Sequence, residues 1–511
     1  MRIERLTSIP DLSNVDPETA LIRVIGSLSK NPYQVFKFRV NTNNTVETAY
    51  KIISASDLDN FADYDFCLEY PWIGNLSLVD NGTGGKDLVF TPTPSEKIAF
   101  MNATDGYGES AFFNTHWTDN QVPSAGKTYA VRGYYSMRTP PSGDHTFAGD
   151  KLIFDDTILS MKGSGIPTVT NMIVMNNAGM SIADSSGARI AGNIYMHPLL
   201  DSGSSYSLGL SGYSILREFT LYASLYGYGD LKLYNCGDPS SGFAEYTVLA
   251  NNTDFFGRVL VYGVSNFSVR VTSEANLGGP PPAFREDQLQ FNGGGISVVN
   301  DVVFDDVNRG IMLLSDGGVA ETRNEDGAFL PGTPEEDRRY EGGAVFRVEN
   351  SSTLTIDCPI TGRGHLLKDG VGTVVLGGNN SYTGITTIAA GSLCPASPDA
   401  FGSGPVEVKD SGRLLRGYSD PAMPNGVELG GPISFVNGGA VLVELAEGET
   451  VDGNFSVPLF LLPEGESIDP ATVPVEHSLD DYIVSATTSS VGSRQLVSAE
   501  FSYQGLLIIL Q

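Results

Sequence analysis

From about residue 127 onward, short runs of apolar and alternating residues are separated by glycine, asparagine and aspartate. Examples are "KLIFDD", "TNMIVMN", "RVLVYG" and "TVVLGG". Alternation with a period of two predicts β-strands, and the residues that bound these runs are those that favour turns. No extended helical pattern interrupts the runs, so the chain is predicted to be all-β. A sandwich array, a propeller and a solenoid all remain compatible with this pattern.

The first part of the chain has a different pattern. In "DPETALIRVIGSLSKN", Asp16 suits a helix N-cap and Pro17 suits the first helical position. Apolar residues follow at helical spacing: Leu21, Val24, Ile25 and Leu28. The pattern predicts one short helix, which we expect to cap the first coil of a solenoid and cover its open edge.

Internal similarity favours the solenoid. "GYGDLKLYN" from Gly227 is similar to "GRGHLLKDG" from Gly362. Downstream of each, "NNTDFFGRVLVYG" from Asn251 is similar to "NNSYTGITTIAAG" from Asn379. The same elements occur twice in the same order with drifting spacing. A solenoid tolerates such drift, because each coil packs only on its neighbours.

One of these stretches, "GHLLKDGVGTVVLGGNNSYTGITTIAAGSL", resembles the autotransporter-associated β-strand repeat, also called the passenger-associated transport repeat. The pattern of that repeat is G-x-L-x-K-x-G-x-G-T-L-x-L-x-G-x-N-x-Y-T-G-x-T-T-I-x-x-G-T-L. Val374 stands where leucine is usual, and Ser392 where threonine is usual. The matching positions are Leu366, Lys368, Gly370, Gly372, Thr373, Leu376, Gly378, Asn380, Tyr382, Thr383, Gly384, Thr386, Thr387, Ile388, Gly391 and Leu393.

The resemblance implies a right-handed parallel β-helix of the kind found in secreted or surface proteins of Gram-negative and related bacteria. We therefore expect three parts: an N-terminal capping and β-rich region at 1–126, the β-helix at 127–450, and C-terminal coils or a cap at 451–511. Asparagines such as Asn380 are expected to form hydrogen-bond ladders at coil corners. Glycines are expected at the left-handed corners.

The two ends of the chain bear on its location. The stretch "RQLVSAEFSYQGLLIILQ" predicts a last strand pair and not the long translocator barrel of an autotransporter, so self-secretion is not expected. The stretch "MRIERLTSIPDL" has no apolar core of signal-peptide length, and no later run could span a bilayer. We expect a secreted or surface-exposed protein whose signal peptide is absent from this sequence.

Composition excludes some functions. The formal charge of −29 over 511 residues repels phosphate backbones and anionic lipids, which argues against nucleic-acid and membrane-surface roles. The four cysteines are widely spaced and form no C-x-x-C motif, so they are expected to be buried apolar residues more often than disulfides. These are Cys67, Cys236, Cys358 and Cys394.

Candidate catalytic and metal-binding groups are sparse. The carboxylate pairs Asp155–Asp156 and Asp305–Asp306 are reminiscent of glycoside hydrolases, but neighbours on a strand point to opposite faces, and "FDD" recurs as a turn motif would. The five histidines lack metal-ligand spacing. Four aspartates in "SDLDNFADYD" form either a Ca²⁺ site or a solvated acidic loop: Asp57, Asp59, Asp63 and Asp65. No cofactor and no metal are predicted.

Two features are candidates for binding. The charged stretch 317–343 interrupts the repeat pattern where a tight turn is expected, and inserted corners often carry function, although a solvated loop is the simpler interpretation. Its candidate contacts are Arg323, Glu335, Glu336, Asp337, Arg338 and Arg339. Aromatic clusters could stack on sugar rings or pack inside the fold. Their candidates are Tyr222, Tyr226, Tyr228 and Trp117.

The sequence therefore predicts a non-enzymatic secreted or surface-exposed β-helix that acts as an extracellular scaffold or adhesin. Its expected partner is a glycan or a host or matrix surface. A polysaccharide lyase or glycoside hydrolase built on a β-helix is the alternative. A phage or viral fibre is a second alternative.

Overall fold

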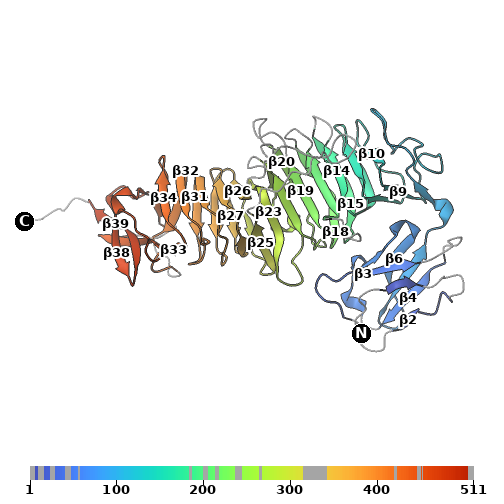
Figure 1. Ribbon diagram of the computed structural model, residues 1–511, viewed down its shortest axis with the longest axis horizontal. Coiled ribbons are helices and arrows are strands. Elements are labelled where there is room, and N and C mark those ends of the chain that lie inside the picture. Colours follow the sequence, from blue (N-terminus) through green and yellow to red (C-terminus); the bar gives the residue numbers. More distant parts are fainter. Residues whose placement is uncertain are drawn as a thin grey trace, which may run out of the picture.

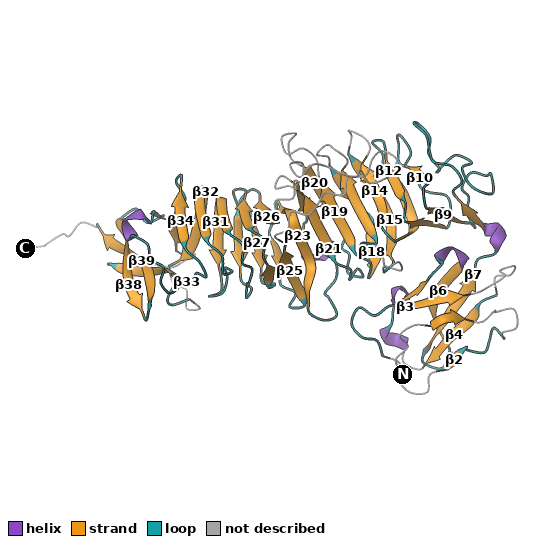
Figure 2. Ribbon diagram, in the orientation of Figure 1, coloured by secondary structure: helices purple, strands orange, loops and turns teal. Residues whose placement is uncertain are grey.

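The computed structural model contains a small N-terminal β structure beside a long β-helix, with almost no helical content (Figures 1 and 2). The description covers residues 6–9, 16–23, 29–40, 48–55, 58–182, 187–198, 205–212, 218–235, 244–263, 267–314, 342–418, 423–445, 451 and 453–504. Among these residues, no helix is long and apolar enough to cross a membrane.

The N-terminal subdomain, which we define as the described residues between 6 and 92, is made of two small sheets around a core of its own. Buried Phe38, Ile52 and Phe90 belong to this core, which is separate from that of the β-helix. One sheet is parallel and contains β1 (Leu6–Ile9), β3 (Phe36–Val40) and β5 (Phe66–Leu68). The other contains β2 (Ile22–Arg23), β4 (Tyr50–Ala55), β7 (Lys86–Pro92) and β6 (Gly74–Asp80).

The predicted N-terminal capping helix is wrong for the residues that are described. Asp16 does cap, because its carboxylate accepts hydrogen bonds from Glu18 N (3.1 Å) and Thr19 Oγ1 (2.8 Å), but the result is a turn. The chain then leaves helical geometry, since Leu21 N donates to Lys51 O and β2 pairs with β4. Sheet pairing has overridden the local helical pattern. Val24, Ile25 and Leu28 lie outside the described residues.

The β-helix is one 28-stranded sheet in which every strand pairing is parallel, which confirms the predicted solenoid. In the first coils the strands stack two elements apart, so that β11 pairs with β9 and β13 while β12 pairs with β10 and β14. The first coils contain β8 (Ile98–Phe100), β9 (Thr128–Arg132), β10 (Ser136–Arg138), β11 (Lys151–Asp155), β12 (Ile158–Met161), β13 (Thr168–Met175), β14 (Ala178–Ile182), β15 (Ala188–Met196), β16 (Leu208–Gly212), β17 (Phe219–Leu221), β18 (Ser224–Gly227), β19 (Leu231–Asn235), β20 (Ala244–Val248), β21 (Val259–Gly263), β22 (Phe267–Arg270), β23 (Arg285–Val298), β24 (Val302–Phe304) and β25 (Arg309–Leu313).

The later coils continue the same stack. Leu366 pairs with Thr386, and Thr386 with Val406, so these coils follow one another every 20 residues. Their strands are β26 (Gly343–Val348), β27 (Thr353–Ile356), β28 (Ile360–Gly362), β29 (Leu366–Asp369), β30 (Thr373–Leu376), β31 (Thr386–Pro395), β32 (Val406–Gly417), β34 (Ile433–Val436), β35 (Ala440–Glu444) and β37 (Val475–His477). Short 3-10 turns occur at η2 (Leu58–Asn60), η3 (Asp63–Asp65), η4 (Pro71–Ile73), η5 (Ser95–Lys97), η7 (Glu274–Leu277) and η9 (Pro470–Thr472).

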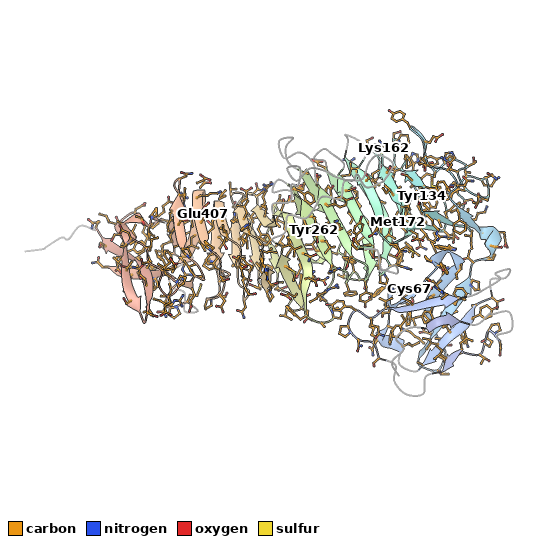
Figure 3. All side chains as sticks on the ribbon, in the orientation of Figure 1. Cys67, Tyr134, Lys162, Met172, Tyr262 and Glu407 are labelled. Atoms are coloured by element: carbon orange, nitrogen blue, oxygen red, sulfur yellow. The ribbon has the colours of Figure 1, made fainter. Side chains whose placement is uncertain are left out.

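Inward side chains fill the solenoid from end to end, as the period of two requires. Met172 (Figure 3) and Leu152 are completely buried members of a single cluster that runs from Ala99 to Phe501. Because every strand of a closed stack pairs on both sides, only the two end coils expose edges and need covers.

The first coil is covered by the segment 101–126 and not by a helix. Trp117, Phe112 and Ala111 are buried in the β-helix core, and the indole Nε1 of Trp117 donates to Ala111 O at 3.2 Å. At the other end lies a four-stranded sheet whose β36–β39 and β39–β38 pairings are antiparallel. It contains β33 (Val427–Glu428), β36 (Phe455–Leu461), β38 (Tyr482–Val491) and β39 (Arg494–Tyr503). The division at 126 and 450 stays a prediction.

The internal repeat has a structural basis in buried asparagines that bridge three coils. The amide of Asn380 accepts from Ile360 N (2.8 Å) and donates to Ala400 O (2.6 Å). Asn252, at the matching place in the first copy, accepts from Leu225 N (2.8 Å) and donates to Asn276 O (2.6 Å). The two copies therefore use one asparagine for the same task, because a buried coil corner leaves backbone groups that need partners.

Lys368, the lysine of the repeat motif, lies in the interior of the β-helix. Lys368 is completely buried in a row that Phe346 and Ile388 also occupy. Its ammonium donates to three carbonyls at the coil corner, those of Asp369 (2.9 Å), Gly370 (2.7 Å) and Ala390 (2.8 Å). Burial lowers the pKa of Lys368 to about 8.

The interpretation of "FDD" as a turn motif is confirmed. Asp156 adopts a left-handed turn conformation with φ of 50°. In the second copy, the Asp306 carboxylate accepts from Asn308 N at 3.0 Å within a turn. These aspartates terminate strands and organise corners.

Candidate binding surface

Most of the charged stretch 317–343 lies outside the described residues. Its candidate contacts all lie outside the described residues, and they stay predictions: Arg323, Glu335, Glu336, Asp337, Arg338 and Arg339.

Trp117 is wrong as a surface contact. Its side chain is 0% exposed and packs edge-on against Tyr129, with ring centroids 4.8 Å apart. Aromatic side chains are large enough to close the open end of a core, and this one is used for that purpose.

The three candidate tyrosines do not form one platform. Tyr222 is 42% exposed. Tyr226 is half-buried and stacks on Tyr195, with centroids 5.1 Å apart and planes 20° apart. Tyr228 faces the N-terminal subdomain, where its hydroxyl donates to the carboxylate of Asp65 at 2.8 Å. Only Tyr222 is left as an exposed candidate contact, and two of the three tyrosines lie at or beside a contact within the chain.

That contact is built on an outward row of apolar side chains, which we call the docking strip: Ala130, Ile153, Ile173, Tyr195 and Tyr226. They are in register on β9, β11, β13, β15 and β18. The N-terminal subdomain lies alongside these coils (Figure 1) and places Trp72 in a buried cluster with three strip residues: Ala130, Ile153 and Ile173. The guanidinium of Arg132 lies 4.2 Å from the Trp72 ring centroid.

A buried lysine joins the two parts. Lys151 projects outward beside Ile153, and its ammonium donates to Pro71 O (3.0 Å) and Gly74 O (2.9 Å) at the two ends of η4. Burial lowers the pKa of Lys151 to about 7. The signal in the sequence is a lysine within the apolar run "KLIFDD", a position that sequence reasoning did not single out.

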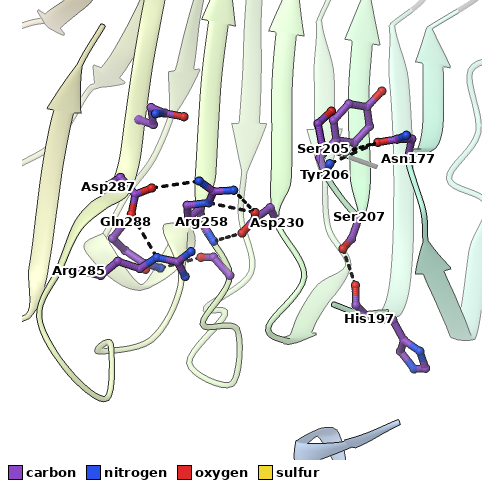
Figure 4. Close-up of polar contacts among 12 residues, drawn as sticks. Asn177, His197, Ser205, Tyr206, Ser207, Asp230, Arg258, Arg285, Asp287 and Gln288 are labelled. Carbon is purple, nitrogen blue, oxygen red and sulfur yellow. Dashed lines mark hydrogen bonds and ion pairs between the residues drawn. The ribbon is translucent and has the colours of Figure 1, made fainter. Parts of the chain in front are cut away.

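His197 lies beside this lysine. Its ring points toward the N-terminal subdomain (Figure 4) and its Nδ1 is buried, although the residue as a whole is only half-buried. Burial lowers the pKa of His197 to about 4, with Lys151 and Lys37 of β3 adding like-charge repulsion. Its carbonyl accepts from the hydroxyl of Ser207. The contact therefore encloses groups that titrate as bases.

Polar contacts continue along the edge of the interface. Lys30 pairs with the fully buried Asp65, whose other oxygen accepts from Tyr228. Tyr64 donates to Asp254 at 3.2 Å, and Tyr33 donates to Ala283 O at 2.5 Å. Burial, followed by the neighbouring carboxylates, raises the pKa of both Tyr64 and Tyr228.

Farther along the coils, a ladder of charges holds a corner together (Figure 4). Arg258 donates to Asp230 through Nε (2.9 Å) and Nη2 (2.5 Å), and to Asp287 through Nη1 (3.0 Å). Arg285 donates to the second oxygen of Asp287 at 3.3 Å. Burial lowers the pKa of Arg258, but bonding to the two aspartates outweighs this effect and raises it. These charges neutralise one another, which is the geometry of a structural ladder.

Sequence reasoning also missed a cation among aromatic rings. The ammonium of Lys232 lies 5.2 Å from the ring centroid of Tyr206 and 5.1 Å from those of Tyr234 and Tyr262, within the range of cation–π attraction. Tyr234 and Tyr262 are directly paired on β19 and β21. The alternation in "LKLY" places the lysine and tyrosine on one outward face and could have revealed the pair.

The described candidate residues are not arranged as a metal site. Among the described residues, no group of three or more His, Cys, Asp or Glu side chains is arranged to hold a metal ion. Asp65 is committed to Lys30 and Tyr228, and Asp63 accepts from Leu78 N at 2.8 Å. Among the described cysteines, Cys67 and Cys358 are free thiols.

The repeat motif in the parallel solenoid matches a known protein family. The family model described as "Passenger-associated-transport-repeat" matches residues 366–393, the stretch that supplies Lys368 and Asn380. The chain carries a repeat of autotransporter passenger domains.

A relative agrees with this assignment. Over 260 residues, the chain is 26% identical to the "Adhesin BmaC autotransporter" of Brucella suis biovar 1 (strain 1330), covering 46% of this chain and 7% of that protein. The chain thus spans a small fraction of that relative's length. No solved structure matches the chain. The repeat and the relative confirm the predicted secreted or cell-surface location.

Proposed function

We propose that this chain is an adhesive, non-enzymatic segment of a surface-exposed passenger protein, built as a stiff stalk that presents contact surfaces to glycans or to a host or matrix surface. The observation that carries the proposal is the passenger repeat within one continuous 28-stranded parallel stack. Each coil is held to its neighbours by backbone pairing and buried asparagines, which suits an extended, protruding structure.

The adhesin relative supports the adhesive role, although the similarity covers only part of each chain. The charges near the strands support the non-enzymatic part of the proposal. Asp155 pairs with Arg132, Asp230 and Asp287 pair with Arg258, and these carboxylates serve coil corners. The glycan part of the proposal rests on outward aromatic side chains such as Tyr222.

A direct binding measurement tests this function. The purified, fluorescently labelled chain is applied to a glycan panel, to immobilised matrix proteins and to host-type cells, with reducing-end and unsaturated-product assays run on the same glycans. We expect saturable binding and no new chain ends. Reproducible glycan cleavage, or the absence of binding to every surface, would overturn the proposal.

Two variants locate the contact. Tyr222→Ala removes a 42% exposed ring, and Val303→Ala trims a 49% exposed side chain on β24 as the matched control. A contact at Tyr222 predicts at least a fivefold rise in Kd for Tyr222→Ala and no change for Val303→Ala. Deleting 317–343 tests the charged stretch in the same assay.

A further inference from the structure

The docking strip is an interaction surface whose occupant is present in the chain itself. Five outward positions in register would expose an apolar stripe if nothing covered them, and stripes of that kind mark contact sites. The occupant is the N-terminal subdomain, which has its own core and contributes Trp72 to the contact.

We propose that the N-terminal subdomain is a releasable cover of the docking strip, and that acidification releases it by charging the bases enclosed between the two parts. This inference does not depend on the adhesive function. It rests on the placement of Lys151 and His197 between two bodies that each possess a core.

Among the residues that the structure describes, no acid balances the enclosed bases. The two hydrogen-bond partners of the Lys151 ammonium are the carbonyls of Pro71 and Gly74, and the described groups that face His197 are the cations Lys151 and Lys37. The described carboxylates of the contact have other partners. Asp65 is paired with Lys30, Asp254 is bonded to Tyr64, and Asp155 is paired with Arg132. Asp63 accepts from Leu78 N and acts on Tyr195 of the docking strip. Burying a charge without a counter-charge is unfavourable, so each proton taken up favours the open form.

The direction of the pH effect follows from the enclosed bases. Docking lowers the pKa of His197 from 6.5 to about 4, so docking weakens as the pH falls through that interval. Docking also lowers the pKa of Lys151 from 10.5 to about 7, so a further weakening has already occurred between pH 10.5 and 7. For His197 the docking equilibrium changes on the order of 100-fold between pH 6.5 and 4.

The chain supplies its own reporter. Its two tryptophans are Trp72, in the contact, and Trp117, enclosed in the cap. The full chain is titrated from pH 8 to pH 4 while tryptophan emission and acrylamide quenching, small-angle scattering and far-UV circular dichroism are recorded. We expect a red shift and greater quenching of Trp72 and a larger radius of gyration, with the β signal retained.

Substitutions isolate the cause. His197→Phe keeps a ring of similar size but cannot be protonated. The Nδ1 of His197 has no hydrogen-bond partner among the described residues, so the substitution removes no such bond there. In this variant the docking equilibrium should change less than about threefold between pH 6.5 and 4. Lys409→Met, which removes a 36% exposed cation on β32, should titrate like the parent.

Three outcomes overturn the proposal. One is the absence of any transition above pH 4. Another is an unchanged transition in His197→Phe. The last is a loss of the β signal together with the shift of Trp72, which would mean that the whole molecule unfolds.

Discussion

The coils near β11 and those near β31 have the same kind of buried interior, but their outward faces differ in whether they are covered. Both bury inward residues such as Leu152 and Ile388 completely. On the outside, Ile153 is enclosed by the N-terminal subdomain, whereas the outward row through Thr387 continues to Glu407 and the exposed Ser434. Figure 3 shows Glu407 far from that subdomain. The shared inward rows form the stack, and the outward rows differ in whether another part of the chain covers them.

An aspartate placed on the outward face of each region should give the largest difference between the two regions. Ile153→Asp places an unpaired charge in the enclosed cluster and should cost about 3–5 kcal/mol of docking. Thr387→Asp occupies a half-buried outward position on β31 and should change stability by less than about 0.5 kcal/mol. Trp72 emission and urea midpoints measure both effects. Equal costs for the two variants would contradict the distinction.

Lys368, the lysine of the repeat motif, should give the next largest effect, on the pH dependence of stability. Because burial lowers the pKa of Lys368 from 10.5 to about 8, the unfolded chain binds the extra proton between these values, and stability should rise as the pH increases from 8 to 10.5. The contribution is about 3 kcal/mol. Urea unfolding at pH 7.5 and 10 should show this increment in the parent and in Lys409→Met but not in Lys368→Met. An identical pH response in all three proteins would refute it.

The bridging asparagines should behave alike in both regions. Asn252→Ala and Asn380→Ala each leave a buried N–H and a buried carbonyl without their partner, at a cost of about 2 kcal/mol each. Asn300→Ala, at an exposed position, is the control and should cost less than about 0.5 kcal/mol. Thermal unfolding compares the three variants. A large difference between the first two would mean that the copies are not equivalent.

The smallest effect belongs to a variable position of the repeat. Val371 is 74% exposed between two corner glycines, so Val371→Thr should change the unfolding free energy by less than about 0.5 kcal/mol. The same denaturant titration checks this value. A loss above 1 kcal/mol would show that the corner has a contact beyond those described.

Much of the β-helix could be predicted, because its determinants are local and repeated. Asn380 and Gly370 stand at fixed places in a motif, and the structure uses them for a bridge between coils and for a corner with φ of 77°. The predicted helix after Asp16 failed because β4 offered Leu21 and Ile22 a strand to pair with. A single segment carries no information about such a partner.

The binding candidates were less predictable for the same reason. Alternation places Tyr226 outward, but it does not say that Tyr195 stacks on it. Trp117 follows a polar "NTH" and has the appearance of a surface residue, yet it closes the first coil. The role of Lys151 is visible only in the structure, where its ammonium donates to the carbonyls of Pro71 and Gly74.

The sequence by itself determined the β-strands, through their period of two, and the turn role of "FDD", through residues that suit corners. It also determined the place of the passenger repeat, and the resemblance to that repeat implied the parallel stack. Only the tertiary structure decided which exterior is covered, what closes the first coil and which bases are enclosed. The physical reason is that inward burial repeats with every coil, whereas the cover of an outward face comes from segments distant in the chain, such as η4 against β11.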